Sequence, residues 1–434
     1  MKRILILGGG FAGAYAAQRL EKRFGQGDDL EVVLVSQENF ILFTPMLHEV
    51  AGSDVGVTDV VQPLRKMLRR TRIVIAEVEA VDLGKRQVWI HHPDLDKRFE
   101  LGYDQLVLAL GAVTNFFGTP GLAEHAMTMK TLGDAMLVRN RAIDALELAD
   151  NQTDPAEQRT TLTVLVAGGG FAGVETAGAV NDLLRESVQF YRRLSADLVR
   201  VVIVHPGDGI LQELGASMGG YAAGKLRQRG VEILLQRKVT GYDGNEVVLD
   251  DGSRIPTRMV IWTAGIAPSS LVAGLPCKLQ HGRVITDECM QVPGWPGVWA
   301  LGDCALVPDG FNPGQYYPPT AQHASRQAIV LADNIAATLA GKAPRPFKFK
   351  LLGLLASIGR RVGVAQVLGM KFSGFVAWWL WRGIYLSKLP GFSKKVRVAI
   401  DWALDLVFAK DLVQLPALRP PAIAVEQKNG DRHP

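Results

Sequence analysis

The chain carries the sequence Gly-Gly-Gly-Phe-Ala-Gly twice, at Gly8–Gly13 and at Gly168–Gly173. Each copy follows a short apolar run, Arg3–Leu7 or Thr163–Ala167, that is typical of a buried strand. In such a turn the first glycine makes the bend, the second lets the backbone approach a pyrophosphate, and the third lets the helix pack on the strand. The N-terminus of that helix attracts phosphate. The repeat, offset by 160 residues, therefore predicts two dinucleotide-binding units.

The residues around each turn complete a strand–turn–helix–strand plan, which predicts an α/β fold with two Rossmann-like units. We expect helices at 14–24 and 174–184, and second strands at 31–35 and 201–205. Apolar runs ending in glycine predict further strands at 103–111 and 258–265. The polar residues Asp150–Arg159 suggest a loop, and a helix is expected from about Ala321 to Ala340.

Length and cysteine content limit the class of protein. A chain of 434 residues suggests two or three domains. Its three cysteines, Cys277, Cys289 and Cys304, form no CxxC pair, so we expect no iron–sulfur cluster, no metal site and no disulfide framework, which fits a reducing cytoplasm. The N-terminus lacks the features of a signal peptide, and no apolar stretch of 18 residues predicts a membrane-spanning helix.

The glycine turns and the strand ends supply the candidate dinucleotide contacts. In the turns they are Gly8, Gly10, Phe11, Ala12 and Gly13, and Gly168, Gly170, Phe171, Ala172 and Gly173. An acidic residue usually ends the second strand and binds the adenine ribose, but Ser36 and His205 stand there. Ser36 can still bind a ribose hydroxyl. His205 can do the same, can tolerate a 2′-phosphate, or is simply an exposed strand end, so NADPH is not excluded beside NADH.

Several further segments give the chain its resemblance to the type II NADH:quinone oxidoreductases, single-subunit respiratory dehydrogenases that pump no protons. Asn39–Leu47, with Thr44 and Pro45, resembles the family's segment beside the isoalloxazine ring. The Leu-Ala-Leu-Gly run with Ala109 and Gly111, and Leu301-Gly-Asp303, are similar to its flavin motifs. The resemblance spans about residues 1–412 and implies FAD on the first unit, with Asp303 bound to the ribitol chain.

The same resemblance implies a quinone site near Pro319–Gln327, which is similar to the family's AQxAxQ motif. Ala321, Gln322 and Ala324 match the motif, but Arg326 occupies the second glutamine position and Gln327 follows it. His323 is either a proton donor or a packing residue. Glu175 either complements a helix N-terminus or, as the resemblance implies, lies beside the nicotinamide and flavin, where it binds NADH or relays protons to the quinone. Ala264 and Gly265 resemble the strand end near the nicotinamide, where Gly265 would leave space.

The C-terminal segment is strongly basic and aromatic. From Lys342 to Ile400 it contains no acidic residue, twelve lysines and arginines, and three tryptophans. Val396, Ile400, Ala403, Leu404 and Val407 share one face of an expected helix, and Arg397, Asp401 and Asp405 the other. Such a segment favours binding to an anionic membrane surface over nucleic acid, although a homodimer interface is an alternative.

Together with the glycine turns and the C-terminal segment, the resemblance implies hydride transfer from NADH to FAD and then two-electron reduction of a membrane quinone. The expected domains are FAD-binding (1–117 and 285–345), NAD(P)H-binding (118–284), membrane-associating (346–415) and a disordered tail (416–434). We expect the enzyme on the cytoplasmic face of the inner (plasma) membrane. A soluble ferredoxin-type reductase or NADH oxidase is the alternative enzyme, and a flavin-bound redox sensor the alternative outside catalysis. Disulfide reductases and sulfide:quinone oxidoreductases use redox-active cysteines that the three cysteines of this chain do not match, so neither class is expected.

Overall fold

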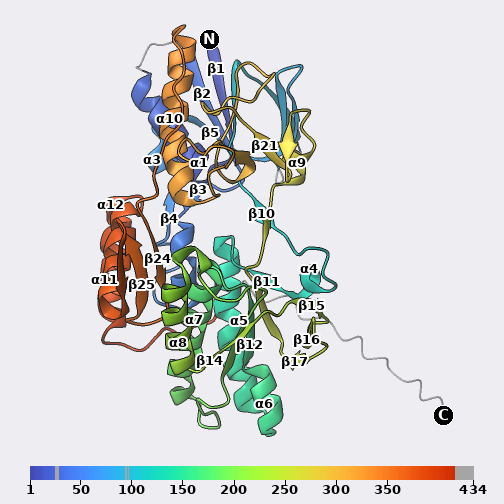
Figure 1. Cartoon of the computed structure of the whole chain (residues 1–434), viewed down its shortest axis with the longest axis vertical. Coiled ribbons are helices and arrows are strands. Elements are labelled where there is room, and N and C mark those ends of the chain that lie inside the picture. Colours follow the sequence, from blue (N-terminus) through green and yellow to red (C-terminus); the bar gives the residue numbers. More distant parts are fainter. Residues whose placement is uncertain (25–28, 93–94, 96, 416–434) are drawn as a thin grey trace, which may run out of the picture.

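The structure is a computed structural model that describes residues 1–24, 29–92, 95 and 97–415, so the predicted disordered tail lies outside the described residues. One glycine turn lies in a parallel five-stranded sheet at the top of Figure 1. Its strands, in spatial order, are β22 (Val298–Ala300), β9 (Gln105–Leu108), β1 (Lys2–Leu7), β2 (Leu30–Ser36) and β5 (Arg72–Ile75). Because β22 joins from far along the chain, this first unit is discontinuous in sequence.

The second glycine turn lies in a second parallel sheet of five strands. In spatial order they are β11 (Met127–Thr128), β18 (Met259–Trp262), β12 (Thr163–Ala167), β13 (Arg200–His205) and β14 (Val231–Leu235). Its helices include α5 (Leu132–Asn151), α7 (Phe171–Ser187) and α8 (Ala216–Gln228). The predicted pair of Rossmann-like units is therefore confirmed.

Two short strands connect the units. β10 (Val113–Thr114) leaves the first unit and β19 (Ile266–Ala267) returns to it, and the two pair antiparallel in the narrow region between the units in Figure 1. Three-stranded antiparallel sheets flank each unit. They are β6 (Glu77–Asp82), β7 (Gln87–His92) and β8 (Lys97–Gly102), and β15 (Val239–Tyr242), β16 (Glu246–Leu249) and β17 (Arg254–Pro256).

The C-terminal segment contains helices, as the sequence predicts, together with a sheet that was not predicted. It begins with an antiparallel sheet and continues with two helices, drawn at the left of Figure 1. These elements are β24 (Gly353–Ser357), β25 (Gly363–Val367), β26 (Met370–Ser373), α11 (Gly374–Lys388) and α12 (Phe392–Asp405). Leu355, Ala356 and Trp381 belong to the same hydrophobic cluster as Val174 and Ala177 of α7. The segment therefore shares a core with the second unit.

Several expected boundaries were wrong for local reasons. Helices α1 (Phe11–Arg23) and α7 begin inside the glycine turns, three residues earlier than expected. The predicted loop at 150–159 contains α6 (Pro155–Thr161), because the Asp154 carboxylate accepts a hydrogen bond from the Ala156 N–H and Pro155 occupies the first helical position. In contrast, α10 (Ala321–Leu339) lies where it was expected and packs on α1.

Candidate active site

The first glycine turn leaves room for a phosphate where its sequence predicts it. Gly8 has φ +109°, and a Cβ there would lie 2.2 Å from the carbonyl oxygen of Ala109. A Cβ on Gly13 would lie 1.9 Å from the carbonyl oxygen of Gly8, so the helix packs on the turn without space for a side chain. No atom lies within 4 Å of a Cβ built on Gly10. The open side of the turn therefore lies at Gly10, at the N-terminus of α1, and it fits the pyrophosphate of a dinucleotide.

The second turn repeats this geometry. A Cβ on Gly168 or Gly173 would collide with the Thr263 hydroxyl, whereas the space around Gly170 is open. The turns thus match in the three positions that the motif requires, and both units fit a dinucleotide. Phe171 and Ala172 follow at the first turn of α7 and line a cavity described below.

The two unusual strand-end residues bind their own loops. The Ser36 hydroxyl donates to the carbonyl oxygen of Glu38 at 2.8 Å. The Nδ1 atom of His205 accepts a hydrogen bond from the Gly169 N–H at 3.1 Å. Burial lowers the pKa of His205. Its ring is therefore neutral at physiological pH, supports the glycine turn, and supplies no positive charge for a 2′-phosphate.

The other strand ends differ in how much space they leave. A Cβ on Gly111 (φ +65°) would meet no atom within 4 Å, and Ala109 is buried behind Gly8. Ala264 packs at the edge of a core cluster. Gly265 has φ +88°, and a Cβ there would lie 2.5 Å from the Phe117 ring.

Asp303 lies in a turn that another predicted segment holds in place. The Gly302 N–H donates to Gln327 Oε1 at 2.9 Å. Gln327 stands one position after the second glutamine of the expected quinone motif, and it supports the turn that carries Asp303 instead. Ala12 packs beneath Gly302. Among the described residues no side chain hydrogen-bonds to the Asp303 carboxylate, and burial raises its pKa. This unpaired carboxylate fits the hydroxyl donors of a ribitol chain.

A central cavity of about 660 Å³ brings distant candidate residues together. Its lining includes Phe11, Thr44, Pro45, Phe171, Ala172, Glu175, Ala321, Gln322 and Arg326 among the predicted residues. It also includes His48, Glu213, Tyr385 and Lys388, which sequence reasoning missed. His48 directly follows the predicted isoalloxazine segment, which was the available signal. Tyr385 and Lys388 come from α11, where the basic and aromatic composition suggested a membrane surface or a dimer interface.

Glu175 lies in the wall of the central cavity, with 7% of its surface exposed. Its Oε1 atom accepts hydrogen bonds from the Ser357 N–H at 3.0 Å and the Trp381 indole N–H at 3.2 Å. Its Oε2 atom lies 3.6 Å from His48 Nδ1. Burial raises the pKa of Glu175 to about 8, more than these hydrogen bonds lower it. Burial also lowers the pKa of His48 to about 3, so its imidazole is neutral.

The predicted quinone residues at the start of α10 do not all face the central cavity. The Gln322 side-chain amide donates to the carbonyl oxygen of Gly353 at 2.9 Å, and its Oε1 atom is buried without a partner among the described residues. Arg326 lines the cavity beside Lys388, whose pKa is lowered by burial and by that neighbouring charge. His323 is not part of the lining. It is buried against Tyr317 and hydrogen-bonded to Thr320, so the structure favours its packing role.

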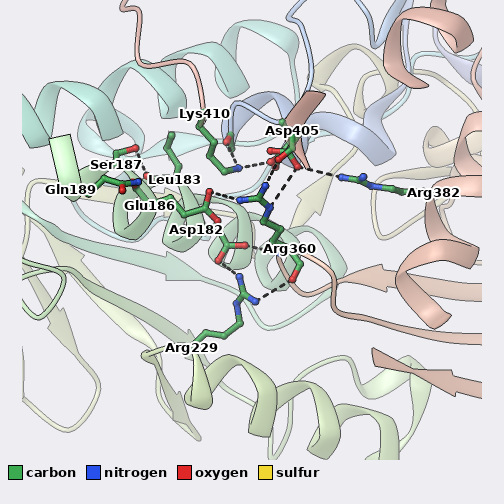
Figure 2. A network of polar contacts seen from close by, with 12 residues as sticks. Asp182, Leu183, Glu186, Ser187, Gln189, Arg229, Arg360, Arg382, Asp405 and Lys410 are labelled. Atoms are coloured by element: carbon green, nitrogen blue, oxygen red, sulfur yellow. Dashed lines mark hydrogen bonds and ion pairs between the residues drawn. The ribbon is translucent and has the colours of Figure 1, made fainter. Parts of the chain in front are cut away.

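Behind the cavity, a network of ion pairs joins α7 to the C-terminal segment (Figure 2). The Arg229 guanidinium pairs with Asp182 of α7, and the Arg360 backbone N–H donates to the same carboxylate at 2.7 Å. The Arg360 side chain pairs with Glu186 at 3.1 Å and approaches Asp405 of α12 at 3.9 Å. Arg382 of α11 lies 3.7 Å from Asp405. The helix that carries Glu175 is thus fixed to the last two helices.

The outer face of the C-terminal helices is apolar. Side chains on α11, α12 and the residues that follow are about half exposed or more, although they are large and hydrophobic. They are Phe375, Val376, Trp379, Phe392, Val396, Ile400, Leu404, Val407 and Phe408. Trp378 and Trp381, which also suggested a membrane surface, are buried instead. Asp401 and Asp405 bond inward to Gly56 and the arginines. In the described part of the chain, no helix is both long and apolar enough to cross a bilayer.

Comparison with known proteins gives matches over most of the chain. Residues 2–328 match the pyridine nucleotide-disulphide oxidoreductase model, and residues 351–411 match the NDH2 C-terminal domain. The type II NADH:quinone oxidoreductase Ndh of Mycobacterium tuberculosis is 31% identical over 421 residues, which cover 93% of this chain and 88% of that protein. The demethylphylloquinone reductase NdbB of Synechocystis is 32% identical over 92% of this chain and 95% of its own length. The structure of NDH2 from Plasmodium falciparum with NADH has a TM-score of 0.88 at 19% identity, covering 95% and 99% of the two chains.

Proposed function

Because the chain belongs to the type II NADH:quinone oxidoreductases, which oxidise NADH with a quinone and pump no protons, we propose that it does so with FAD on the first unit, NADH on the second and quinone in the central cavity. The proposed domains are FAD-binding (1–117 and 285–345), NADH-binding (118–284) and membrane-associating (346–415). The convergence of both glycine units, the Gln322 helix and α11 on one cavity carries this proposal.

A bound flavin would supply the redox chemistry that links a hydride from the nicotinamide to two-electron reduction of the quinone. The chain supplies binding and orientation. The two glycine turns and Asp303 fit the diphosphate and ribitol groups, as described above. The neutral His205 supports a choice of NADH over NADPH, because a 2′-phosphate needs a cationic partner.

Glu175 is the residue that we propose to donate a proton to the quinone oxygen. With a pKa of about 8 it is mostly protonated at neutral pH, which suits a general acid working near that pH. Ser357 and Trp381 fix one of its oxygens, so the carboxyl cannot turn freely in the cavity wall. The unpaired Oε1 atom of Gln322 can accept the O–H of the quinol product.

The exposed apolar face of α11 and α12 supports attachment to a membrane from which the quinone enters. An amphipathic helix binds a bilayer by burying such a face, and the basic residues of the segment add attraction to anionic lipids. We propose the cytoplasmic face, where NADH is formed and three free cysteines are compatible with a reducing compartment. A second copy of the chain is the competing occupant of this face.

The test is NADH oxidation by purified enzyme with a short-chain quinone, comparing wild type with Gln322→Leu. Loss of one hydrogen bond to the bound quinone or quinol should raise the KM for quinone about tenfold, while reduction of the flavin by NADH keeps its rate. Gln228→Leu, on the exposed part of α8, is the matched control. Unchanged KM would remove Gln322 from the site, and absence of quinone-dependent turnover in the wild type would refute the function.

A further inference from the structure

Quinone reduction consumes a proton from solution that the central cavity is poorly placed to supply. The quinol gains two O–H bonds, but NADH delivers one hydride, so one proton per turnover must come from water. Glu175 is the proposed donor, and its exposed side faces the cavity that flavin, nicotinamide and quinone would fill. Reprotonation of Glu175 from behind the cavity would avoid this obstruction.

A rear cavity of about 330 Å³ lies on the other side of α2 (Leu47–Ala51). Its walls are residues 53–57, the end of α12 and the segment that follows α12, and they include Asp54, Asp405 and Lys410. Leu47 and His48, at the start of α2, line the central cavity. The segment after α2 lines the rear cavity, and a helix of five residues is about 7.5 Å long, so the chain passes from one cavity to the other over a short distance.

Glu49 lies between the cavities, with 4% of its surface exposed. Its Oε2 atom accepts a hydrogen bond from the Trp402 indole N–H at 2.6 Å, and its carbonyl oxygen accepts one from the Asp54 N–H at 2.8 Å. The rings of Trp402 and Trp381 lie 6.2 Å apart, and Trp381 in turn binds Glu175. Two tryptophan–carboxyl hydrogen bonds, from indole rings that are tilted to each other, therefore lie next to each other between Glu49 and Glu175.

We propose that Asp54 and Glu49 carry the proton that quinone reduction takes from solution, from the rear cavity to Glu175. The proposal rests on the proposed role of Glu175 at the quinone site. In each turnover Glu175 gives its O–H proton to the quinone oxygen, Glu49 reprotonates Glu175, and Asp54 reprotonates Glu49. Water in the rear cavity restores Asp54, so every group returns to its initial state.

Both carboxyl groups can hold a proton near neutral pH. Burial raises the pKa of Glu49 despite the nearby Arg382, and burial raises the pKa of Asp54 despite its contact with Lys410. Glu49 also raises the pKa of Glu175, which indicates that their charges interact directly. The charged and titratable groups that face the route among the described residues are His48 on α2, Arg139 on α5, Glu175 and Asp182 on α7, Arg382 on α11, Asp401 and Asp405 on α12, and Lys410 and Asp411 beyond it.

The network in Figure 2 keeps this route in place. Arg360 and Arg382 approach Asp405 from two sides, and Lys410 donates to the carbonyl oxygen of Gly52 at 2.7 Å as well as to Asp54. Asp405 lines the rear cavity, and its buried Oδ2 atom lies near both arginines but has no hydrogen-bond partner among the described residues. A polar wall of this kind suits water at the entrance.

Glu49→Gln in the full-length holoenzyme tests the proposal. It keeps the acceptor for Trp402 but cannot carry a proton. Quinone-dependent turnover should fall about tenfold or more across pH 6–9, acetate should restore part of it, and flavin reduction by NADH should keep its rate. Asp59→Asn is the matched control. Asp59 is another buried carboxylate near α2 that pairs with Lys394 at 3.3 Å and lies on neither cavity, so turnover should be unchanged.

A second variant keeps the carboxyl group and shifts its pKa. Trp402→Phe removes the N–H that favours the charged form of Glu49, so the alkaline limb of the turnover profile should move to higher pH by about half a unit to one unit. Normal turnover of Glu49→Gln without any acetate effect, or an unmoved profile in Trp402→Phe, would overturn the relay. Absence of quinone reduction in wild type would instead refute the proposed function.

Discussion

Replacing Glu175 by glutamine should raise the stability of this protein at alkaline pH and at the same time lower its activity. Glutamine can accept the same bonds from Ser357 and Trp381, and its amide can donate towards His48. It carries no charge in the buried site. The substitution therefore removes the ionisation of a group whose pKa is raised from 4.5 to about 8.

The raised pKa of Glu175 determines the sign and the upper limit of the change in the free energy of unfolding. A carboxyl with a higher pKa in the folded state binds more protons there than when unfolded, so its contribution is full below pH 4.5 and is lost as the pH rises towards 8. The shift is about 3.5 pH units, and each unit corresponds to about 1.4 kcal/mol. Glu175→Gln should therefore gain at most about 5 kcal/mol over wild type at pH 9, and no more than about 1 kcal/mol at pH 5.

Urea unfolding of both proteins at pH 5, 7 and 9, followed by tryptophan fluorescence, measures this difference. Glu157→Gln on α6 is the control, because it makes the same chemical change at an exposed position. The same Glu175→Gln protein should lose most quinone-dependent turnover. A stability difference that stays constant from pH 5 to pH 9 would show that Glu175 is not held protonated by burial, and would refute the reasoning.

Two further predictions concern the membrane and the nucleotide. Ile400→Glu combined with Phe408→Glu should lower binding to anionic lipid vesicles about 100-fold or more, because burying each side chain contributes about 1.5–3 kcal/mol. Sedimentation with vesicles measures the binding, and Leu148→Glu on α5 is the control. Loss of dimers without loss of vesicle binding would favour a dimer interface instead. His205→Arg should raise kcat/KM for NADPH relative to NADH about tenfold by placing a cation at the end of β13, and an unchanged ratio would exclude this position from the ribose site.

The parts of the fold that the sequence predicts best are those in which the backbone itself is constrained. The collisions that a Cβ would make at Gly8, Gly13, Gly168 and Gly173 leave glycine as the residue that fits, so strand, turn and helix follow directly. The boundary of α10 was also predictable, because Thr320 caps it after a proline-rich segment. The loop expected across α6 was wrong because the polar composition hid an Asp-Pro helix start.

The rest of the site depends on contacts between distant segments. His48, Tyr385 and Lys388 come from opposite ends of the chain, and no local pattern links them. Amphipathicity predicted two faces for α12, but only packing shows that the acidic face points inward. The same holds for His205 and Gln327, whose partners are backbone N–H groups of loops that the sequence could not place beside them.

In α12 the acidic side chains face inward and the large apolar side chains face solvent, which has a practical consequence for protein engineering. Programmes that improve solubility replace exposed apolar residues by polar ones, and here they would select Phe392, Ile400, Leu404, Val407 and Phe408 first. The fold would tolerate these changes, because α12 is held through Trp402, Val398 and the inward-facing Asp401 and Asp405. The product would be a water-soluble oxidoreductase that still serves dissolved short-chain quinones but no longer reaches those in lipid.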